Sequence, residues 1–228
     1  MTALPTIIID TREPALEAGD DPSAIFVPRV WAPHKKDEPF QSRVRIDLPT
    51  KRAKLNVGDY SIEGLEGSVA LERKTLEDLL STLFGSGTDA LGERTSNLDR
   101  FRAELERARD GAFFAIFVET SIAKLYAEAK VRHDRYGKGF DPESVLGMLD
   151  AFAVDLGVPT YWWEKRSLAE VRVGTVLTRI WEQATGRAAS KKAHARSYAI
   201  PWLDALAKPA TKVSPDKYGS DATPEDRT

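Results

Sequence analysis

The sequence contains no cysteine, which excludes disulfide bonds, cysteine-ligated zinc and a cysteine nucleophile. Histidine is scarce as well, since His34, His133 and His194 lie far apart and lack the spacing of zinc ligands. No apolar run approaches the roughly 18 residues that a membrane-spanning helix needs, so we expect no membrane partner. The opening MTALPTIIID has no basic segment and too short an apolar run for a signal peptide. These absences predict a cytoplasmic protein.

The formal net charge of −2 does not by itself indicate a nucleic-acid partner, and the distribution of charge is more informative. Between Arg29 and Lys54 there are eight lysines and arginines against three acids. A second basic group begins at Arg187. Both groups suit binding to a phosphate backbone, and both also suit solvated surface loops. Composition leaves that choice open.

Strand and helix signals alternate along the chain. Buried or alternating apolar runs predict strands at 4–9, 60–62, 69–73, 113–118 and 158–163. Capping signals and helical spacing predict helices that follow Thr75, span 95–109 and 121–130, open at Asp141-Pro142, and run from a cap at Ser167 to about Gly186. The glycines at 85, 87 and 92 predict a loop. This alternation predicts an α/β fold, an α/β/α sandwich with a central mixed β-sheet.

The length of 228 residues suits one domain with appendages. We expect the domain to occupy 1–186, with a proline-rich insertion at about 14–54 that contains an exposed strand at 44–48. Residues 187–228 are rich in Ala, Lys, Pro and Ser, which predicts a basic, flexible tail.

The most informative stretch is GDYSIEGLEGSVALERKTLED at 58–78. Alternate residues of a strand share a face, so Glu72 and Lys74 are expected to point the same way and Arg73 the other way. A hairpin over 60–71 would bring Asp59 to the same edge of the sheet. Two carboxylates suit a hard divalent cation, and a nearby ammonium stabilises charge that develops on a phosphate. The pattern therefore predicts a metal-dependent nuclease.

The same residues resemble a known family. GDY at 58–60, ERK at 72–74 and Asp78 are similar to the G-D-x(n)-E-R-K-x(3)-D signature of the XPF family of structure-specific DNA endonucleases. The resemblance extends to IIIDTRE at 7–13, to RFRAEL in the following helix and to FFAIFVE at 113–119, so that it covers about 4–160. It implies a restriction-endonuclease-like fold and Mg²⁺- or Mn²⁺-dependent cleavage of DNA at branched, flap or fork structures.

The resemblance also implies roles for single residues. Asp59, Glu72 and Asp10 match metal-binding and catalytic acids, Glu13 matches a further catalytic acid, and Lys74 matches the catalytic lysine. The supporting residues that it implies are Asp78, Arg73 and Arg12. It also implies that Arg94 is a positioning residue that binds DNA. In the insertion, composition rather than the resemblance leads us to expect that Arg43, Arg45, Lys35 and Lys36 bind DNA.

Several of these residues also suit structural roles. Asp10 is placed to end a strand and cap a turn. Asp78 lies in the first turn of a helix, where its negative charge interacts favourably with the helix dipole. Arg73 is equally suited to an internal ion pair and to a DNA contact. Tyr60 is more typical of core packing than of base stacking.

The sequence departs from the family in two places. Residues 164–228 lack the paired hairpin glycines of the tandem helix-hairpin-helix module that many members carry, and the 14–54 insertion is long. Substrate choice could therefore lie in the insertion, where Phe26, Trp31 and Phe40 are interleaved with basic residues. The alternative is that these aromatics pack on the domain.

Two other functions remain open: a non-catalytic DNA-binding scaffold subunit, and a restriction or recombination nuclease acting on duplex or single-stranded DNA. The intact acids and lysine favour catalysis. DNA is the expected partner, with a homodimer or a protein partner in addition. The last helix has an apolar face that could serve as a dimer interface or could cover the sheet. Its residues are Val171, Val176, Leu177, Ile180 and Trp181.

Overall fold

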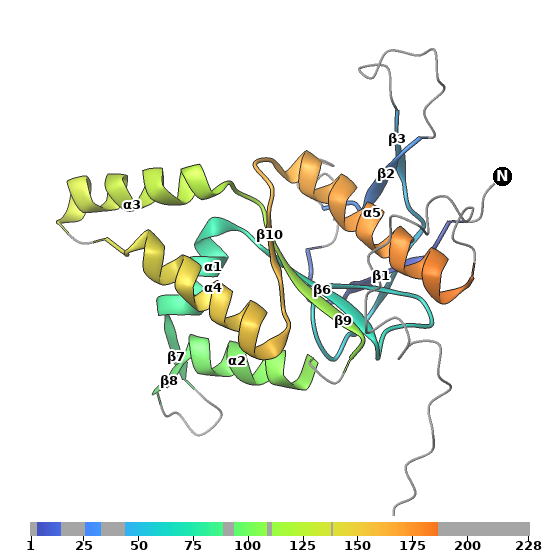
Figure 1. The fold of residues 1–228 in the computed structure, drawn as a ribbon, viewed down its shortest axis with the longest axis horizontal. Helices are drawn as coiled ribbons and strands as arrows, with labels where there is room; N and C mark the ends of the chain where they lie inside the picture. Colours follow the sequence, from blue (N-terminus) through green and yellow to red (C-terminus); the bar gives the residue numbers. More distant parts are fainter. Residues whose placement is uncertain are drawn as a thin grey trace, which may run out of the picture.

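The computed structural model describes residues 4–14, 26–32, 44–88, 94–108, 111–137 and 139–186. Within this part of the chain, strands and helices alternate much as expected (Figure 1). The strands are β1 (Ile7–Asp10), β2 (Arg29–Trp31), β3 (Arg45–Asp47), β4 (Thr50–Ala53), β5 (Tyr60–Ile62), β6 (Val69–Lys74), β7 (Ser86–Thr88), β8 (Arg94–Ser96), β9 (Phe113–Val118) and β10 (Thr160–Trp162). The helices are α1 (Leu76–Phe84), α2 (Asn97–Ala108), α3 (Ile122–Tyr136), α4 (Pro142–Leu156) and α5 (Arg166–Ala184).

The central sheet has six strands in the order β10-β9-β6-β5-β1-β4. The pairs β10–β9, β9–β6 and β1–β4 are parallel, whereas β5 runs antiparallel to both of its neighbours. The buried runs IIID of β1 and FFAIFV of β9 form the interior of this sheet because it is covered on both faces. The mixed sheet confirms the expected architecture.

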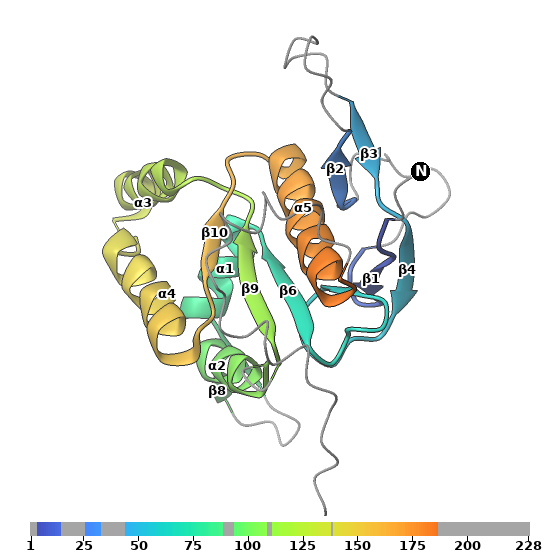
Figure 2. The ribbon, with the colours of Figure 1, turned by 45° about the vertical axis from the view of Figure 1, so that its right-hand side comes forward.

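Two hydrophobic clusters lie on opposite faces of the sheet. On one face, Phe114 and Ile116 of β9 pack with Leu79 of α1, Leu105 of α2 and residues of α3 and α4. On the other, Phe117 packs with residues of α5, β1 and β5. Figure 2 shows α5 on one side of the β9–β6 pair, with α3 and α4 on the other. The molecule is therefore an α/β/α sandwich.

The insertion contributes more to the fold than its sequence indicates. β3 is the exposed strand expected at 44–48, and it pairs with β2 in a hairpin that packs against α5. This contact requires Gly174, because a Cβ atom there would lie 2.1 Å from the carbonyl oxygen of Arg29. β4 has no apolar alternation, yet it pairs with β1 as an edge strand of the main sheet.

Helix boundaries follow the capping signals with one exception. Thr75 and Asp141 cap α1 and α4 as predicted. The prediction that Ser167 caps the last helix is wrong, because Leu168 N already donates to the carbonyl of Lys165 and α5 begins at Arg166. α3 continues beyond the expected 121–130 to Tyr136, where Gly137 ends it in the left-handed conformation.

The glycine-marked segment after α1 also differs from its prediction. Where a loop was expected, β7 and β8 form a two-stranded antiparallel ribbon. Backbone pairing between Ser86–Thr88 and Arg94–Ser96 makes this ribbon, and short polar strands of this kind carry no apolar pattern.

The apolar face of α5 covers the sheet. Leu177 and Ile180 are buried, and Val176 and Trp181 pack against the same cluster, so this face does not provide the dimer interface that the sequence left open. Residues 187–228 lie outside the described residues, and the division at 186 stays a prediction. Among the described helices, none combines the length and apolarity needed to cross a bilayer.

Candidate active site

Strand β6 distributes the ERK motif between the two faces of the sheet. Glu72 and Lys74 face α2, and their side chains form an ion pair of 2.7 Å between Oε1 and Nζ. The Lys74 ammonium also lies 5.0 Å from the centre of the Phe101 ring on α2, a cation–π distance. Arg73 points to the opposite face, where it lies over Phe26. The period-two prediction for these three residues is thus confirmed.

The turn before β5 brings Asp59 to the same place. Gly58 has φ of 71°, a left-handed conformation that favours glycine, and a Cβ atom there would lie 3.0 Å from the Leu71 carbonyl oxygen. Asp59 N donates to that carbonyl, and the Asp59 carboxylate accepts from Arg73 N at 2.8 Å. The backbone pairing of Tyr60 with Leu71 therefore carries Asp59 to the end of β6, beside Glu72.

Burial makes this group of charges unusual. Burial, with repulsion from Glu72 and Glu13, raises the pKa of Asp59 to about 8. Burial also raises the pKa of Glu72, despite the opposing attraction of Lys74. Burial alone would lower the pKa of Lys74, but attraction by Glu72 and the hydrogen bond that Lys74 donates to it raise it overall. Two buried carboxylates, Asp59 and Glu72, thus lie beside a single ammonium, that of Lys74, which cannot compensate the charges of both.

Asp10 is fully buried at the end of β1, and its oxygens are both engaged by protein donors. Oδ1 accepts from Arg12 N and Nε at 2.7 Å, and Oδ2 accepts from Leu55 N at 2.5 Å. Burial opposes ionisation of Asp10, but these hydrogen bonds lower its pKa overall. The geometry matches the turn-capping role that the sequence left open. The Arg12 side chain is 61% exposed and lies at the surface beside the site.

Glu13 belongs to a network on the α5 face. The Arg73 guanidinium contacts Glu13 Oε2 at 2.9 Å and Glu119 Oε1 at 3.4 Å, and the Tyr60 hydroxyl donates to Glu13 at 2.8 Å. Arg166 approaches Glu119 from α5. Tyr60 is buried in the core, and Arg73 is an internal ion-pair partner. In both cases the structure favours the structural alternative.

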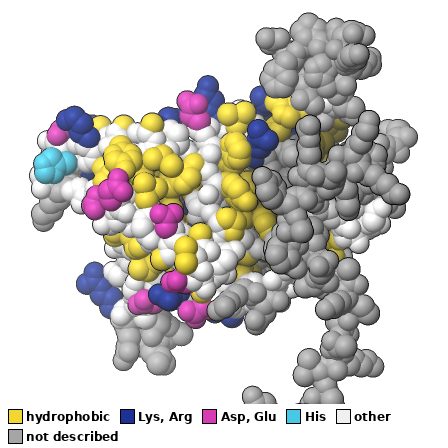
Figure 3. Space-filling view, viewed as in Figure 1, with side chains coloured by type: hydrophobic (Ala, Val, Ile, Leu, Met, Phe, Trp, Pro, Cys, Tyr) yellow, Lys and Arg dark blue, Asp and Glu magenta, His cyan; other side chains and the backbone are white. Residues whose placement is uncertain are grey.

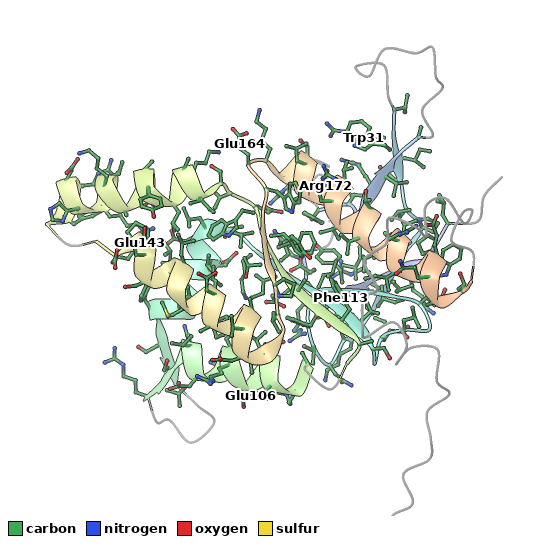
Figure 4. All side chains as sticks on the ribbon, viewed as in Figure 1. Trp31, Glu106, Phe113, Glu143, Glu164 and Arg172 are labelled. Carbon is green, nitrogen blue, oxygen red and sulfur yellow. The ribbon has the colours of Figure 1, made fainter. Side chains whose placement is uncertain are left out.

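Three other predicted residues, Asp78, Arg94 and Arg45, contact groups other than these acids. Asp78 accepts from the Thr75 hydroxyl at 2.6 Å and donates its N–H to it, which is a helix-capping arrangement. Arg94 is exposed on β8 and donates to Ser86. Arg45 on β3 lies 5.4 Å from the Trp31 ring. Figure 4 labels Trp31 on β2 and Arg172 on α5, two elements that pack against each other. Lys35, Lys36 and Arg43, like Phe40, lie outside the described residues.

Comparison with known proteins supports the resemblance. The family model of the ERCC4 domain matches residues 10–169. The chain belongs to the ERCC4 domain family. This match extends over every element from Asp10 to the first turn of α5, and it confirms an XPF-type nuclease domain.

Two solved structures are similar to this ERCC4 domain. XPF from Aeropyrum pernix, in complex with DNA, has 17% sequence identity and a TM-score of 0.46 over 82% of this chain and 69% of that chain. A second structure of XPF from Aeropyrum pernix has 18% identity and a TM-score of 0.45, over 78% of this chain and 61% of that chain. A comparison with curated proteins found no match.

Sequence reasoning missed one acid of this ERCC4 domain. Glu104 on α2 accepts weakly from Gly58 N at 3.5 Å, and its charge helps to raise the pKa of Lys74 and of Arg12. Glu104 therefore lies beside Asp59 and the ion pair. Its signal was present in the RFRAELER segment, where residues 100, 104 and 107 share one helix face.

Arg52 of β4 is a second residue that the sequence did not reveal. Its guanidinium donates to the carbonyl oxygens of Asp10, Thr11 and Glu13, and to that of Pro14. These bonds fix the loop that follows β1 and carries Arg12 and Glu13. Arg52 thus positions acidic and basic groups without facing the site itself.

The ERCC4 domain offers two carboxylates for a cation. Within the described ranges no group of three or more His, Cys, Asp and Glu side chains is arranged to hold a metal ion. Asp59 and Glu72 fit such an ion nonetheless, because both are carboxylates held at one end of β6, and burial raises the pKa of each. Mg²⁺ keeps several water ligands and needs only one or two carboxylates. Asp10 is engaged by Arg12 and Leu55 and does not join them in this arrangement.

Proposed function

We propose that this ERCC4 domain is a Mg²⁺- or Mn²⁺-dependent DNA endonuclease that hydrolyses phosphodiester bonds, with a preference for branched, flap or fork DNA. The observation that carries the proposal is the convergence of Asp59, Glu72 and Lys74 at one end of β6. Membership of the ERCC4 family supports it. The DNA in the related XPF complex belongs to that protein and is consistent with a DNA substrate here.

Each side chain has a role that follows from its position. Asp59 and Glu72 would hold the cation, which when bound activates water and neutralises charge on the phosphate. The Lys74 ammonium, which pairs with Glu72, would lie beside a phosphate oxygen of the substrate. Lys74 would then stabilise negative charge that develops there in the transition state. Phe101 beneath the ammonium excludes water on that side.

The test is cleavage of labelled flap, fork and linear duplex DNA by the purified chain with Mg²⁺, with Mn²⁺ and with EDTA. We expect product with either metal and none with EDTA. Asp59→Asn and Lys74→Met should each lower kcat by about 10²-fold or more, the typical cost of losing one group that stabilises the transition state. Asp150→Asn, an exposed acid on α4, serves as the matched control and should leave kcat unchanged. Equal product from Asp59→Asn and the wild-type chain would refute the assignment.

The second candidate is a non-catalytic DNA-binding subunit. It is favoured by the engagement of Asp10 in protein hydrogen bonds and by the absence of a three-acid cluster among the described residues. DNA binding without metal-dependent product would support it. Cleavage of linear duplex at the rate of flap or fork DNA would instead support a restriction or recombination nuclease.

A further inference from the structure

A polar groove opens beside the proposed site, between α2 and the loops that follow β1 and β4. Its volume is about 400 Å³. The residues that line it include Arg12, Asn56, Asn97, Arg100, Glu104 and Arg107. Phe101, which packs against Lys74, and Glu104, which contacts Gly58 N, connect this groove to the acids. We call it the α2 groove.

The α2 groove is built mainly from one face of a helix. Residues 97, 100, 104 and 107 recur at spacings of three and four, so their side chains lie along the same side of α2. Arg100 and Arg107 are exposed, and neither forms an ion pair with another described residue. Arg12 faces them from the loop after β1. Three guanidinium groups thus converge with one carboxylate, Glu104, between them.

On the opposite side of α2, surface charges of opposite sign form an ion pair within the helix. Arg102 pairs with Glu106 one turn away, at 3.3 Å. Figure 4 shows Glu106 at the outer side of α2, and Figure 3 shows that charges of both signs gather along that edge. Among the described residues, Arg100 and Arg107 lack such partners, which leaves their charge available to an anion, whereas Arg12 pairs with Asp10.

Neighbouring groups hold two of these side chains in place: Arg12 is bonded to Asp10, and Asn97 is bonded to the end of α1. Asn97 Nδ2 donates to the Ser81 carbonyl at 3.0 Å, which leaves its amide oxygen facing the ribbon. The Arg100 guanidinium lies against the β7–β8 ribbon, where a Cβ atom on Gly87 would come within 3.2 Å of Nη1. Pre-positioned guanidinium groups lose less entropy when they bind a phosphate.

The chemistry of the lining identifies the ligand class. Guanidinium and amide groups suit phosphodiester oxygens, and the one aromatic side chain of the lining, Phe101, is buried and cannot stack on a base. A larger cavity between α1, α3 and α4 is a poorer match, because the acids Glu77, Glu128 and Asp141 are among its lining residues.

We propose that the α2 groove binds the sugar-phosphate backbone of a DNA strand and leads that strand to Asp59, Glu72 and Lys74. This rests on the proposed function, because it names the path by which the substrate reaches that site. Arg100 and Arg107 supply phosphate contacts, and Arg12 supplies the contact nearest to the acids.

The test is fluorescence anisotropy with labelled single-stranded and duplex DNA in EDTA, where binding is measured without cleavage. Arg100→Ala and Arg107→Ala should each weaken binding by roughly 10-fold, the usual effect of losing one hydrogen bond to a charged group. The double variant should lower the slope of log K against log salt by about 1.4 for single strands, because two phosphate contacts are lost. The matched control is Arg102→Ala, which removes the same charge from the other side of α2 and should leave both quantities unchanged.

Several outcomes would overturn the α2 groove proposal: no DNA binding by the wild-type chain, unchanged binding by the double variant at an unchanged melting temperature, or an equal loss in Arg102→Ala. Failure of the proposed function looks different. A wild-type chain that binds DNA through Arg100 and Arg107, but forms no product with Mg²⁺ or Mn²⁺, would support the groove and refute the nuclease. In an active enzyme, the double variant should raise KM and leave kcat unchanged, as expected for loss of uniform binding.

Discussion

The network around Arg73 allows a direct test of what this residue does. Replacing Arg73 by Met keeps most of the apolar stem over Phe26 but removes the guanidinium that contacts Glu13 and Glu119. The side chains of Arg73, Glu13 and Glu119 are 11%, 13% and 7% exposed, so the variant leaves two acids largely buried without their shared partner. Breaking a buried ion pair in this way costs about 3–5 kcal/mol.

The measurement is the melting temperature of the purified chain at neutral pH. For a protein of this length, 1 kcal/mol corresponds to roughly 2–4 °C, so Arg73→Met should melt about 6–20 °C below the wild-type chain. Arg102→Met breaks an exposed helical pair with Glu106 that is worth only about 0.3–0.5 kcal/mol, and it should shift the melt by less than about 2 °C.

A second variant tests the cause. Adding Glu13→Gln to Arg73→Met removes one of the uncompensated charges, and it should recover part of the lost stability. If Arg73→Met has the same melting temperature as the Arg102→Met control, the network does not stabilise the fold and the reasoning is refuted. Weaker DNA binding at an unchanged melting temperature would then return Arg73 to the role of a DNA contact.

Three further predictions concern other parts of the molecule. In EDTA the melting temperature should fall as the pH rises from 5 to 8. In the folded chain the pKa of Asp59 is raised to about 8 and that of Glu72 is also raised. The folded chain therefore keeps protons that the unfolded chain has released in this pH range, and a rise in pH favours unfolding. Asp59→Asn should remove much of this fall, and an unchanged slope would contradict the burial argument. Gly174→Ala should cost about 1–3 kcal/mol by forcing the Arg29 carbonyl away from α5, with faster proteolysis of the β2–β3 hairpin as the second readout; an unchanged melt would contradict it. Asp78→Ala should lower the melt by about 1–4 °C, as expected for a first-turn acid, and should leave kcat unchanged, whereas a loss like that of Asp59→Asn would place Asp78 in the site.

The parts of the fold that the sequence predicted are those specified by local patterns. β1 and β9 are buried β-branched or aromatic runs, and α1 and α4 begin at Thr75 and Asp141 where side-chain caps are present. The grouping of Asp59 with Glu72 followed from the period of a strand and the length of a hairpin. These signals act over a few residues and need no knowledge of the tertiary structure.

The parts that were missed depend on contacts between distant segments. β4 is a polar segment, TKRA, that becomes a strand because it pairs with β1, and no periodicity marks it. The network of Glu13, Arg73 and Glu119 joins residues more than 40 positions apart. The apolar stripe of α2 is sufficient to predict the helix, so no role was assigned from the sequence to Glu104 and its neighbouring arginines.

The hydrogen bonds of the Arg52 guanidinium limit which segments of the insertion can be deleted from this protein. Since Arg52 lies in β4 and fixes the backbone of the Asp10–Glu13 loop, the insertion is not a detachable module. Grafting this ERCC4 domain onto another scaffold, or trimming it to a minimal version, has to retain residues 44–54 even where the rest of the insertion is replaced. A chimera cut at 14 and 54 would lose an edge strand of the sheet and release the loop that presents Arg12.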